Sequence, residues 1–338
     1  MTNIWTKLDK PIMALAPMAD VTDSAFRQII ARRGKPDLFF TEFVSADGLT
    51  HKEAHFKLGR ELHYTPTEKP LIAQLFSANP EAMEKAAAVV SGLGFDGIDI
   101  NMGCPDRAVC RQGAGASLIK NPRLAQELIA SARSGAGDLP VSVKTRIGDT
   151  RIDLETWPEA LLEAKPAAIT FHLRTRSEMS KVEAHWELVD DLMKTVAGSE
   201  TLILANGDVS DLSEAKEKSE AHGLDGIMIG RAIFGDPWFF SRLKPQGIRD
   251  RLEALLEHID VFSEMYLPGS VNQELFGGHV KNWAVMKKHI KAYVSGFAGA
   301  ADLRQNLMDT AGPKEAEELI RRYLNSSGSE TKSFKTEE

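Results

Sequence analysis

Cysteine is scarce in this chain, and its scarcity excludes a disulfide-stabilised fold. The 338-residue sequence has two cysteines, Cys104 and Cys110, and both lie in one short segment. Two thiols in a chain of this length are typical of proteins from a reducing compartment. We therefore expect a cytoplasmic protein. No histidine pair accompanies them at zinc spacing, so no metal site is expected.

Long apolar runs are also missing. No segment approaches a run of about eighteen apolar residues, and the N-terminus MTNIWTKLDKP lacks the apolar core of a secretory signal. We therefore expect no membrane span and no membrane partner. The composition, 43% hydrophobic and 26% charged, is that of an ordinary globular protein.

The chain has no excess of positive charge. Its formal net charge of −7 argues against a nucleic-acid partner, because such proteins neutralise phosphates with clustered Lys and Arg. Near the C-terminus, however, Lys281, Lys288 and Lys291 form a locally basic segment whose spacing of seven and three predicts one helical face. That face is a candidate contact for RNA phosphates, although most charged helix faces are simply solvated.

Short runs rich in Ile, Val, Leu and Phe alternate with helical patterns over the first two-thirds of the chain. Such alternation predicts parallel strands joined by helical crossovers. Eight strands in about 240 residues favour a (β/α)8 TIM barrel. An open doubly wound sheet is the alternative, but no G-x-G-x-x-G follows the first strand. The strands are expected at 12–17, 38–44, 70–76, 97–101, 140–145, 167–173, 201–206 and 226–230, with helices at 80–94, 122–135 and 211–223 among those between them.

The strand pattern stops after Pro237, and helical patterns follow over 249–266, 279–297 and 314–324. We therefore expect a catalytic barrel domain over 1–245 and a small all-helical domain over 246–325. The polar segment 326–338 is expected to be a disordered tail.

Polar or turn-forming residues stand at the end of each expected strand. Because ligand and catalytic groups of such barrels lie at the C-terminal ends of the strands, this convergence predicts an active site. The residues concerned are Pro17, Met18, Glu42, Gln74, Asn101, Cys104, Lys144, Arg146, His172, Arg174, Asn206, Gly207, Asp208, Gly230 and Arg231.

Several of these residues allow more than one interpretation. Gly207 and Gly230 could let backbone amides approach a phosphate beside Arg231, or could only make turns. Lys144 could form a Schiff base, act as a cation beside an electron-rich ring, or reach solvent. The imidazole of His172 is expected to donate to the same ligand as Lys144. Gln74 could bind the edge of a heterocycle or be a buried amide bonded to the backbone.

Cys104 lies between a glycine and a proline just after a strand. A nucleophile would need an adjacent base, whereas a proton donor needs only a well-placed thiol, which is mostly protonated at neutral pH. The glycine-rich segment RQGAGASL that follows has the composition of a mobile loop. A general acid is therefore favoured.

These motifs together resemble the tRNA-dihydrouridine synthases. The stretches that carry the resemblance are LAPMADVTDSAFR, PLIAQLFSANPE, DINMGCP, GAGASLIKNP, VKTRIG, FHLRTR, ANGDV and IMIGRAIFGDPW, with MKKH and AADLRQNL further on, so it covers about residues 11–310. The resemblance implies flavin mononucleotide (FMN) as the cofactor and NADPH or NADH as the reductant. It also implies reduction of uridines in tRNA to 5,6-dihydrouridine, with hydride delivered to C6 and a proton from Cys104 to C5.

The resemblance also assigns residues. FMN would be held by Pro17, Met18, Gln74, Lys144, His172, Asn206, Gly207, Asp208, Gly230 and Arg231. By the same resemblance, Asn101 would hold the uracil, and Arg174 and Arg176 match a pair of arginines near the site. Arg146 at its strand end and the lysines of the basic helical segment, Lys281, Lys288 and Lys291, are our further candidates for substrate contact. The chain departs from the family at Leu173 and at the run 182–186, in the loop after the sixth expected strand (167–173). We expect a monomer.

Other activities remain open from the sequence. The chain could be a barrel flavoenzyme for a small molecule, like dihydroorotate dehydrogenase or an ene-reductase, or could modify ribosomal RNA. It could also be a non-catalytic RNA-binding barrel, although Cys104 and Lys144 speak against that. The basic helical segment near the C-terminus favours an RNA substrate.

Overall fold

The computed structural model describes residues 3–51, 59–245, 247–270 and 272–330. Its contacts divide the chain into two units. The first holds the N-terminal residues up to Ser24 together with Pro36–Ala232, and the second holds Ala25–Lys35 together with the chain from Ile233 onward.

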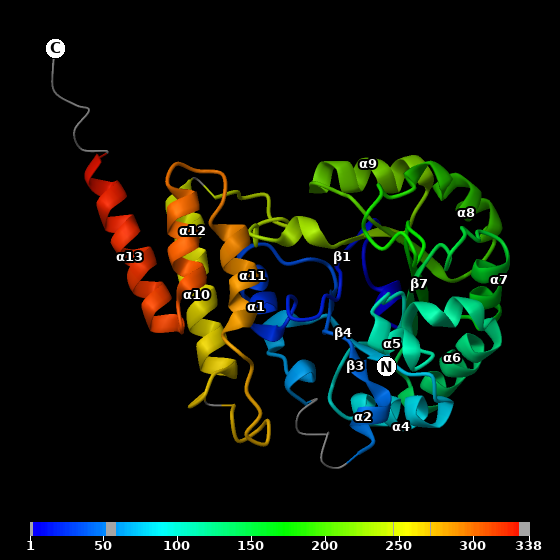
Figure 1. Cartoon of the computed structure of the whole chain (residues 1–338). Helices are drawn as coiled ribbons and strands as arrows, with labels where there is room; N and C mark the ends of the chain where they lie inside the picture. Colours follow the sequence, from blue (N-terminus) through cyan, green and yellow to red (C-terminus); the bar gives the residue numbers. More distant parts are fainter. Residues whose placement is uncertain (1–2, 52–58, 246, 271, 331–338) are drawn as a thin grey trace. The chain divides into compact units, whose positions relative to one another are not determined.

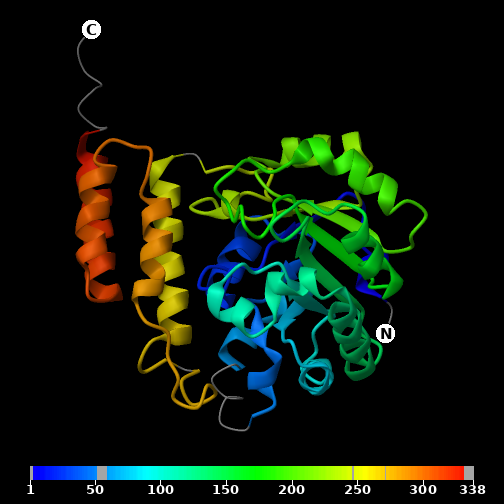
Figure 2. The same cartoon turned by 45° about the vertical axis from the view of Figure 1, so that its right-hand side comes forward.

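The first unit is a barrel of parallel strands, which confirms the predicted fold class (Figure 1). Neighbouring strands run in the order β1-β9-β8-β7-β6-β5-β4-β2, with β3 also paired to β4. Helices lie on the outside of the strands, as Figure 2 shows from a second direction. The strands are β1 (Ile12–Leu15), β2 (Phe39–Phe40), β3 (Val44–Ser45), β4 (Leu71–Phe76), β5 (Gly97–Met102), β6 (Val141–Arg146), β7 (Ala168–His172), β8 (Leu202–Asn206) and β9 (Gly226–Ile229). The helices that follow them include α4 (Pro80–Ser91), α6 (Pro122–Ala136), α7 (Thr156–Glu163), α8 (Val189–Thr195) and α9 (Leu212–His222).

The barrel closes between β1 and the segment before β2. The Leu15 amide donates to the Leu38 carbonyl at 3.0 Å, and the Asp37 amide donates to the Met13 carbonyl at 2.9 Å. The strand expected over 38–44 is split into β2 and β3. The reason is Thr41, whose hydroxyl, rather than a backbone carbonyl, accepts the amide of Gln74 at 3.0 Å and so interrupts the ladder.

An apolar cluster fills the barrel near the amino ends of its strands. Trp5, from the short 3-10 helix Ile4–Thr6, is buried there against Ile12, Leu38 and Ile72. Because this end is packed with hydrophobic side chains, the opposite end is the one left for polar groups.

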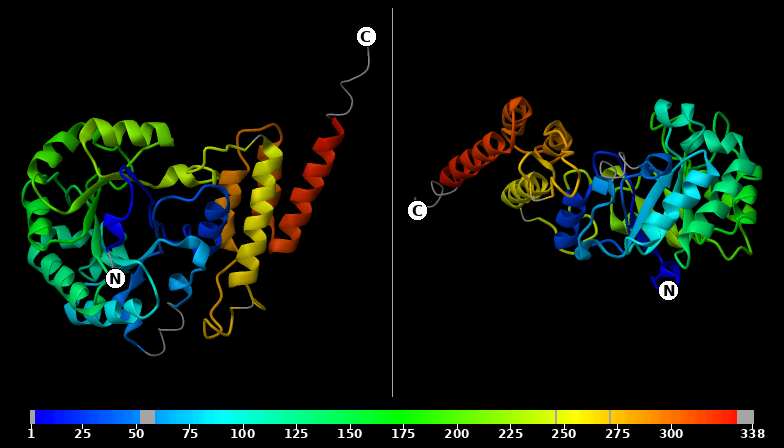
Figure 3. Two further views of the ribbon diagram at one scale, coloured as in Figure 1. Left: turned by 180° about the vertical axis from the view of Figure 1, so that it is seen from behind. Right: turned by 90° about the horizontal axis from the view of Figure 1, so that it is seen from below.

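The second unit is helical. It contains α10 (Ile248–Tyr266), α11 (Ala284–Tyr293), α12 (Ala300–Asp309) and α13 (Pro313–Glu330), whose ribbons lie side by side in Figure 3. It also contains nearly all of α1 (Ser24–Arg33), the helix between β1 and β2. Phe26 of α1 stacks on His258 with ring centroids 5.0 Å apart, and Arg32 and Arg33 pair with Glu257.

Two features of this unit were not predicted from the sequence. The segment containing FAGAAD, expected to be a turn, provides the start of α12 after Gly299, which has a φ of 76°. Helix α13 continues to Glu330, past the expected start of the tail at residue 326, and residues 331–338 lie outside the described residues. Within the described part of the chain, no helix combines the length and the apolar character needed to cross a bilayer.

Candidate active site

A cavity of about 840 Å³ opens at the carboxyl ends of the barrel strands. Thirteen of the residues predicted at the site line this cavity, and they come from most of the strands. They are Pro17, Met18, Asn101, Cys104, Lys144, Arg146, His172, Arg174, Asn206, Gly207, Asp208, Gly230 and Arg231.

The strand register explains how residues far apart in sequence meet here. Asn101 of β5 lies beside Lys144 of β6, and Arg146 lies beside His172 of β7, which in turn lies beside Asn206 of β8. Because side chains alternate along a strand, Lys144 and Arg146 project from the same face of β6. The periodicity of the sequence therefore dictates this part of the site.

The Asn101 side chain builds the turn that carries Cys104. Its Oδ1 accepts the amides of Gly103 at 3.1 Å and Cys104 at 2.9 Å, an arrangement typical of Asx turns. Burial raises the pKa of the Cys104 thiol, so the thiol keeps its proton at neutral pH. Cys110 lies in the next short helix, α5 (Arg107–Arg111), and its Sγ lies 3.5 Å from the Cys104 carbonyl.

Beneath Asn101 lies a buried polar layer inside the barrel. Asn101 Nδ2 donates to Gln74 Oε1 at 2.9 Å, and Gln74 Nε2 donates to Asp99 Oδ2 at 2.7 Å. The other Asp99 oxygen accepts the Ser142 hydroxyl at 2.6 Å. Burial raises the pKa of Asp99 to about 6, against the hydrogen bonds from Ser142 and Gln74. Gln74, expected to bind cofactor, thus lies under the wall of the cavity and does not line it.

Lys144 and His172 line the cavity, and the pKa of each is lowered by its surroundings. Burial and the nearby Arg146 lower the pKa of Lys144 to about 8, and its ammonium donates to Asn206 Oδ1 at 3.1 Å. Burial, with Lys144 and three guanidinium groups around it, lowers the pKa of His172 well below its ordinary value. Arg174 Nη1 lies 3.0 Å from His172 Nε2. Because a guanidinium only donates, Nε2 is the acceptor and the proton of the neutral ring is on Nδ1.

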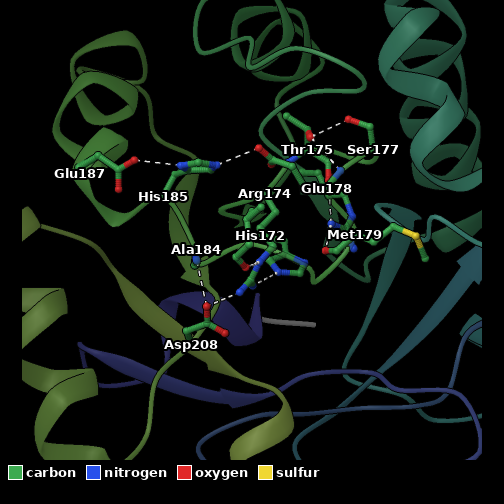
Figure 4. Close-up of polar contacts among 12 residues, drawn as sticks. His172, Arg174, Thr175, Ser177, Glu178, Met179, Ala184, His185, Glu187 and Asp208 are labelled. Atoms are coloured by element: carbon green, nitrogen blue, oxygen red, sulfur yellow. Dashed lines mark hydrogen bonds and ion pairs between the residues drawn. The ribbon is translucent and has the colours of Figure 1, made fainter.

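The far wall of the cavity is an ion network at the ends of β7 and β8 (Figure 4). Asp208 pairs with Arg174 and, through its other oxygen, with Arg231 at 2.6 Å. Asp208 also accepts the Ala184 amide at 2.9 Å, and Arg174 Nε donates to the Val182 carbonyl at 2.8 Å. The loop after β7 is thereby tied to the cavity wall.

The same loop is linked to the Cys104 turn by Arg146. Its Nη1 donates to the carbonyls of Thr175 at 3.0 Å and Met179 at 2.9 Å, while its Nε donates to the Gly103 carbonyl at 2.7 Å. Burial lowers the pKa of Arg146 to about 10, so it remains a cation at neutral pH.

Other predicted residues lie elsewhere. Arg176 pairs with Asp149, which also holds Lys120 at 2.9 Å, and does not line the cavity. Glu42 is buried and accepts the Asp20 amide at 2.6 Å.

The expectation that three lysines share one helical face is wrong for Lys281. Helix α11 begins at Ala284, and Lys281 is only 5% exposed, with its ammonium 4.8 Å from the centre of the Tyr266 ring. Lys288 and Lys291 are on α11 and exposed. Their contact with RNA stays a prediction.

Sequence reasoning missed Asp99, Glu178 and His185. A lone carboxylate in the otherwise apolar strand GIDIN was a usable signal for Asp99, since unpartnered buried charge is costly. The two loop residues carry no periodic signal. In the described ranges no three His, Cys, Asp or Glu side chains are grouped so that they could hold a metal ion.

A parallel barrel with a thiol, an ammonium and several guanidinium groups at the carboxyl ends of its strands belongs to the (β/α)8-barrel class of enzymes. A family model described as dihydrouridine synthase matches residues 14–327. The chain therefore belongs to the dihydrouridine synthase family, and is an oxidoreductase of that family.

Individual relatives agree with the family match. The "probable tRNA-dihydrouridine synthase 2" of Bacillus subtilis (strain 168) is 38% identical over 331 residues, which covers 96% of this chain and 98% of the relative. The "probable tRNA-dihydrouridine synthase" of Staphylococcus aureus (strain MRSA252) is 37% identical and covers 94% of both chains. A solved structure of 2-naphthoyl-CoA reductase with 2-naphthoyl-CoA has a TM-score of 0.52 at 12% identity, and the match covers 84% of this chain and 56% of that one. That likeness shows the fold alone.

Proposed function

We propose that this chain is an FMN-dependent tRNA-dihydrouridine synthase that reduces uridines in tRNA with NADPH or NADH as the reductant. The observation that carries the proposal is the Cys104 thiol, protonated by burial and held by the Asn101 turn at a large cavity that Lys144 also lines. A tRNA substrate would be met in the cytoplasm. A monomer remains our prediction.

The cavity fits FMN in two respects. A Cβ added to Gly230 would meet only the Asn206 amide nitrogen, at 3.7 Å, so the backbone there borders open space in which a phosphate could sit beside Arg231. The Lys144 ammonium has three protons, and within the described part of the chain it donates only to Asn206, which leaves donors for an electron-rich ring. His172, with its proton on Nδ1, is a further donor at the same wall.

When bound, FMN supplies the hydride for C6 of the uracil, and NADPH or NADH restores the reduced flavin. Cys104 supplies the proton for C5, so the carbon–carbon double bond is saturated and the thiolate regains a proton from solvent. The thiol needs to be protonated at the start, which its raised pKa ensures. A uridine in folded RNA must leave its stack to reach the cavity.

The RNA would also contact the helical unit. Lys288 and Lys291 are suited to phosphates because both are cationic side chains exposed to solvent on α11.

The test is a single-turnover experiment without oxygen, in which the pre-reduced protein meets unmodified tRNA and dihydrouridine is measured by mass spectrometry. Cys104→Ala should bind FMN and accept hydride from NADPH normally, because neither step needs the thiol proton. Its flavin should be reoxidised by tRNA about 10²–10⁴-fold more slowly, the usual effect of losing a positioned acid. Cys110→Ala is the matched control and should behave as wild type.

Two results would contradict the proposal. The first is a folded protein that takes up no FMN. The second is reoxidation at the wild-type rate in Cys104→Ala. Reduction of ribosomal RNA or of a free pyrimidine in place of tRNA would correct the substrate and leave the chemistry unchanged.

A further inference from the structure

His185 lies between two carboxylates in the loop that follows β7 (Figure 4). Its Nε2 is 3.0 Å from Glu178 Oε1, and its Nδ1 is 2.9 Å from Glu187 Oε1. An ionised carboxylate only accepts hydrogen bonds, and a neutral imidazole donates through one nitrogen only. Both bonds therefore form together only when His185 is an imidazolium cation.

The charges around His185 favour that cation. Glu178 faces it from the loop and Glu187 from the 3-10 helix Trp186–Leu188, while Arg146 acts on Glu178 from β6. The bond to Glu187 raises the pKa of His185 above its ordinary value, opposed by partial burial and aided by Glu178. Burial alone would raise the pKa of Glu178, but the Thr175 amide and His185 bring it below its ordinary value. Glu178 therefore stays ionised, and of this pair the histidine is the group whose protonation changes as the pH rises.

Glu178 passes the effect of His185 to the backbone of the loop. Its second oxygen, Oε2, accepts the Thr175 amide at 2.7 Å, and its own amide donates to Thr175 Oγ1 at 3.3 Å. This closed turn presents the carbonyls of Thr175 and Met179 to Arg146. Arg146 in turn holds the Gly103 carbonyl, one residue before Cys104.

We propose that His185 is a positioning residue for Cys104, because its cation fixes Glu178 and the loop 174–187 and thereby orients Arg146 against the Gly103–Cys104 turn. This inference rests on the proposed role of Cys104 as the acid. Deprotonation turns one ring nitrogen into an acceptor that faces a carboxylate, so that bond is lost. The positioning is complete below the pKa of His185 and is lost as the pH rises through it.

The first test measures pH dependence. The single-turnover rate of flavin reoxidation by tRNA should fall about threefold to tenfold as the pH rises through the titration of His185. This range corresponds to the usual strength of a partly exposed ion pair, which is what the loop loses. The His185 titration itself is followed by NMR of its ring Cε1–H. Lys144, with a pKa of about 8, and Cys104, with its raised pKa, also titrate, so the step that belongs to His185 is the one that follows its NMR titration and is absent from His185→Gln. Reduction by NADPH should show no step with His185.

Two variants and one control make the test specific. His185→Gln should have the lower rate at all pH values and should lack the His185 step. Glu187→Gln leaves the bonds between Glu178 and Thr175 intact but removes the larger cause of the raised pKa, so the NMR titration and the rate step should both move to lower pH. His222→Gln removes a histidine that pairs with a single carboxylate, Asp190 at 2.6 Å, and whose ring stacks on Trp186 beside His185. It therefore controls for loss of packing against the loop and should keep the wild-type pH step.

Amide hydrogen exchange of the loop 174–187 tests the same inference without RNA. After correction for the intrinsic pH dependence, protection should fall as the pH passes the His185 pKa in the wild type and should be low throughout in His185→Gln. Equal protection in the two proteins, or a rate step that persists in His185→Gln, overturns the inference. If the wild type makes no dihydrouridine at any pH, the proposed function fails, and the exchange data still decide whether His185 fixes the loop.

Discussion

Replacing Gln74 by glutamate tests the buried layer beneath the cavity. Gln74 donates to Asp99 at 2.7 Å and accepts from Asn101 at 2.9 Å. An ionised glutamate of the same shape would set two carboxylates against each other at this distance, whereas a protonated one could donate to Asp99 and still accept from Asn101. In Gln74→Glu the introduced carboxyl and Asp99 should therefore retain one shared proton in the folded protein.

The magnitude follows from proton counting. Since the pKa of Asp99 is about 6 in the folded protein, the wild-type layer holds no proton well above that pH. The folded variant would hold one more proton than the unfolded chain, whose glutamates have an ordinary pKa of about 4.3. A carboxyl whose pKa is higher in the folded than in the unfolded state stabilises the folded protein at low pH, and this stabilisation is lost as the pH rises. The free energy of unfolding of Gln74→Glu should thus fall relative to wild type by about 1.4 kcal/mol per pH unit, or about 2 kcal/mol from about pH 6.5 to about pH 8.

Urea unfolding at a series of pH values measures this difference, with Gln74→Leu as the control. The leucine variant leaves Asp99 and Asn101 each without one partner, which should cost about 1–3 kcal/mol per group. Loss of the Gln74 bond also raises the pKa of Asp99, so Gln74→Leu measures the pH dependence that Asp99 contributes without a second carboxyl. A difference between Gln74→Glu and wild type that does not change with pH would refute the hydrogen-bonding order described for this layer. An equal slope in Gln74→Leu would assign the effect to Asp99 alone and not to a proton shared with the introduced carboxyl.

Three further predictions concern cofactor and RNA. Gly230→Ala should fold as stably as wild type, because its methyl group meets open space, but should weaken FMN binding at least tenfold by occupying the space proposed for the phosphate. Gly92→Ala, at the end of α4, is the control, and titration of the apoprotein with FMN gives the affinity. Arg231→Ala should weaken FMN binding about tenfold, the low end for a charge-assisted contact, because the side chain is 59% exposed. Lys288→Glu with Lys291→Glu should lower tRNA affinity and reduce the slope of log affinity against log salt by about 1–2, whereas an unchanged slope in a folded variant would exclude these lysines from the RNA contact.

The barrel could be predicted because its strands are encoded by local pattern. Runs such as TLILAN and GIMIG are apolar on both faces, which is typical of strands buried in a parallel sheet, and β8 and β9 form there. The split between β2 and β3 could not be predicted in this way. It depends on the Thr41 hydroxyl replacing a backbone acceptor for Gln74, whereas β7 remains continuous with Thr170 inside it.

The placement of α1 illustrates a second limit. Its amphipathic pattern shows that Ser24–Arg33 needs an apolar partner but does not show which one. The ring of Phe26 packs on His258 and His289, more than two hundred residues later in the chain. A domain boundary drawn along the sequence cannot describe a unit built from two separate segments.

In the candidate site, too, the residues on strands could be predicted from the sequence and those in loops could not. Asn101, Lys144 and His172 could be placed together from sequence because register and alternation leave each strand end only one position in the barrel. His185 and Glu178 lie in a loop whose sequence has no hydrophobic periodicity. They are linked to Cys104 through Arg146. The sequence identifies Arg146 as a strand-end residue but does not show which groups it contacts. In a barrel with strands fixed in this manner, variation in pH response or substrate between relatives is therefore expected to arise from loop contacts to the shared strand-end residues.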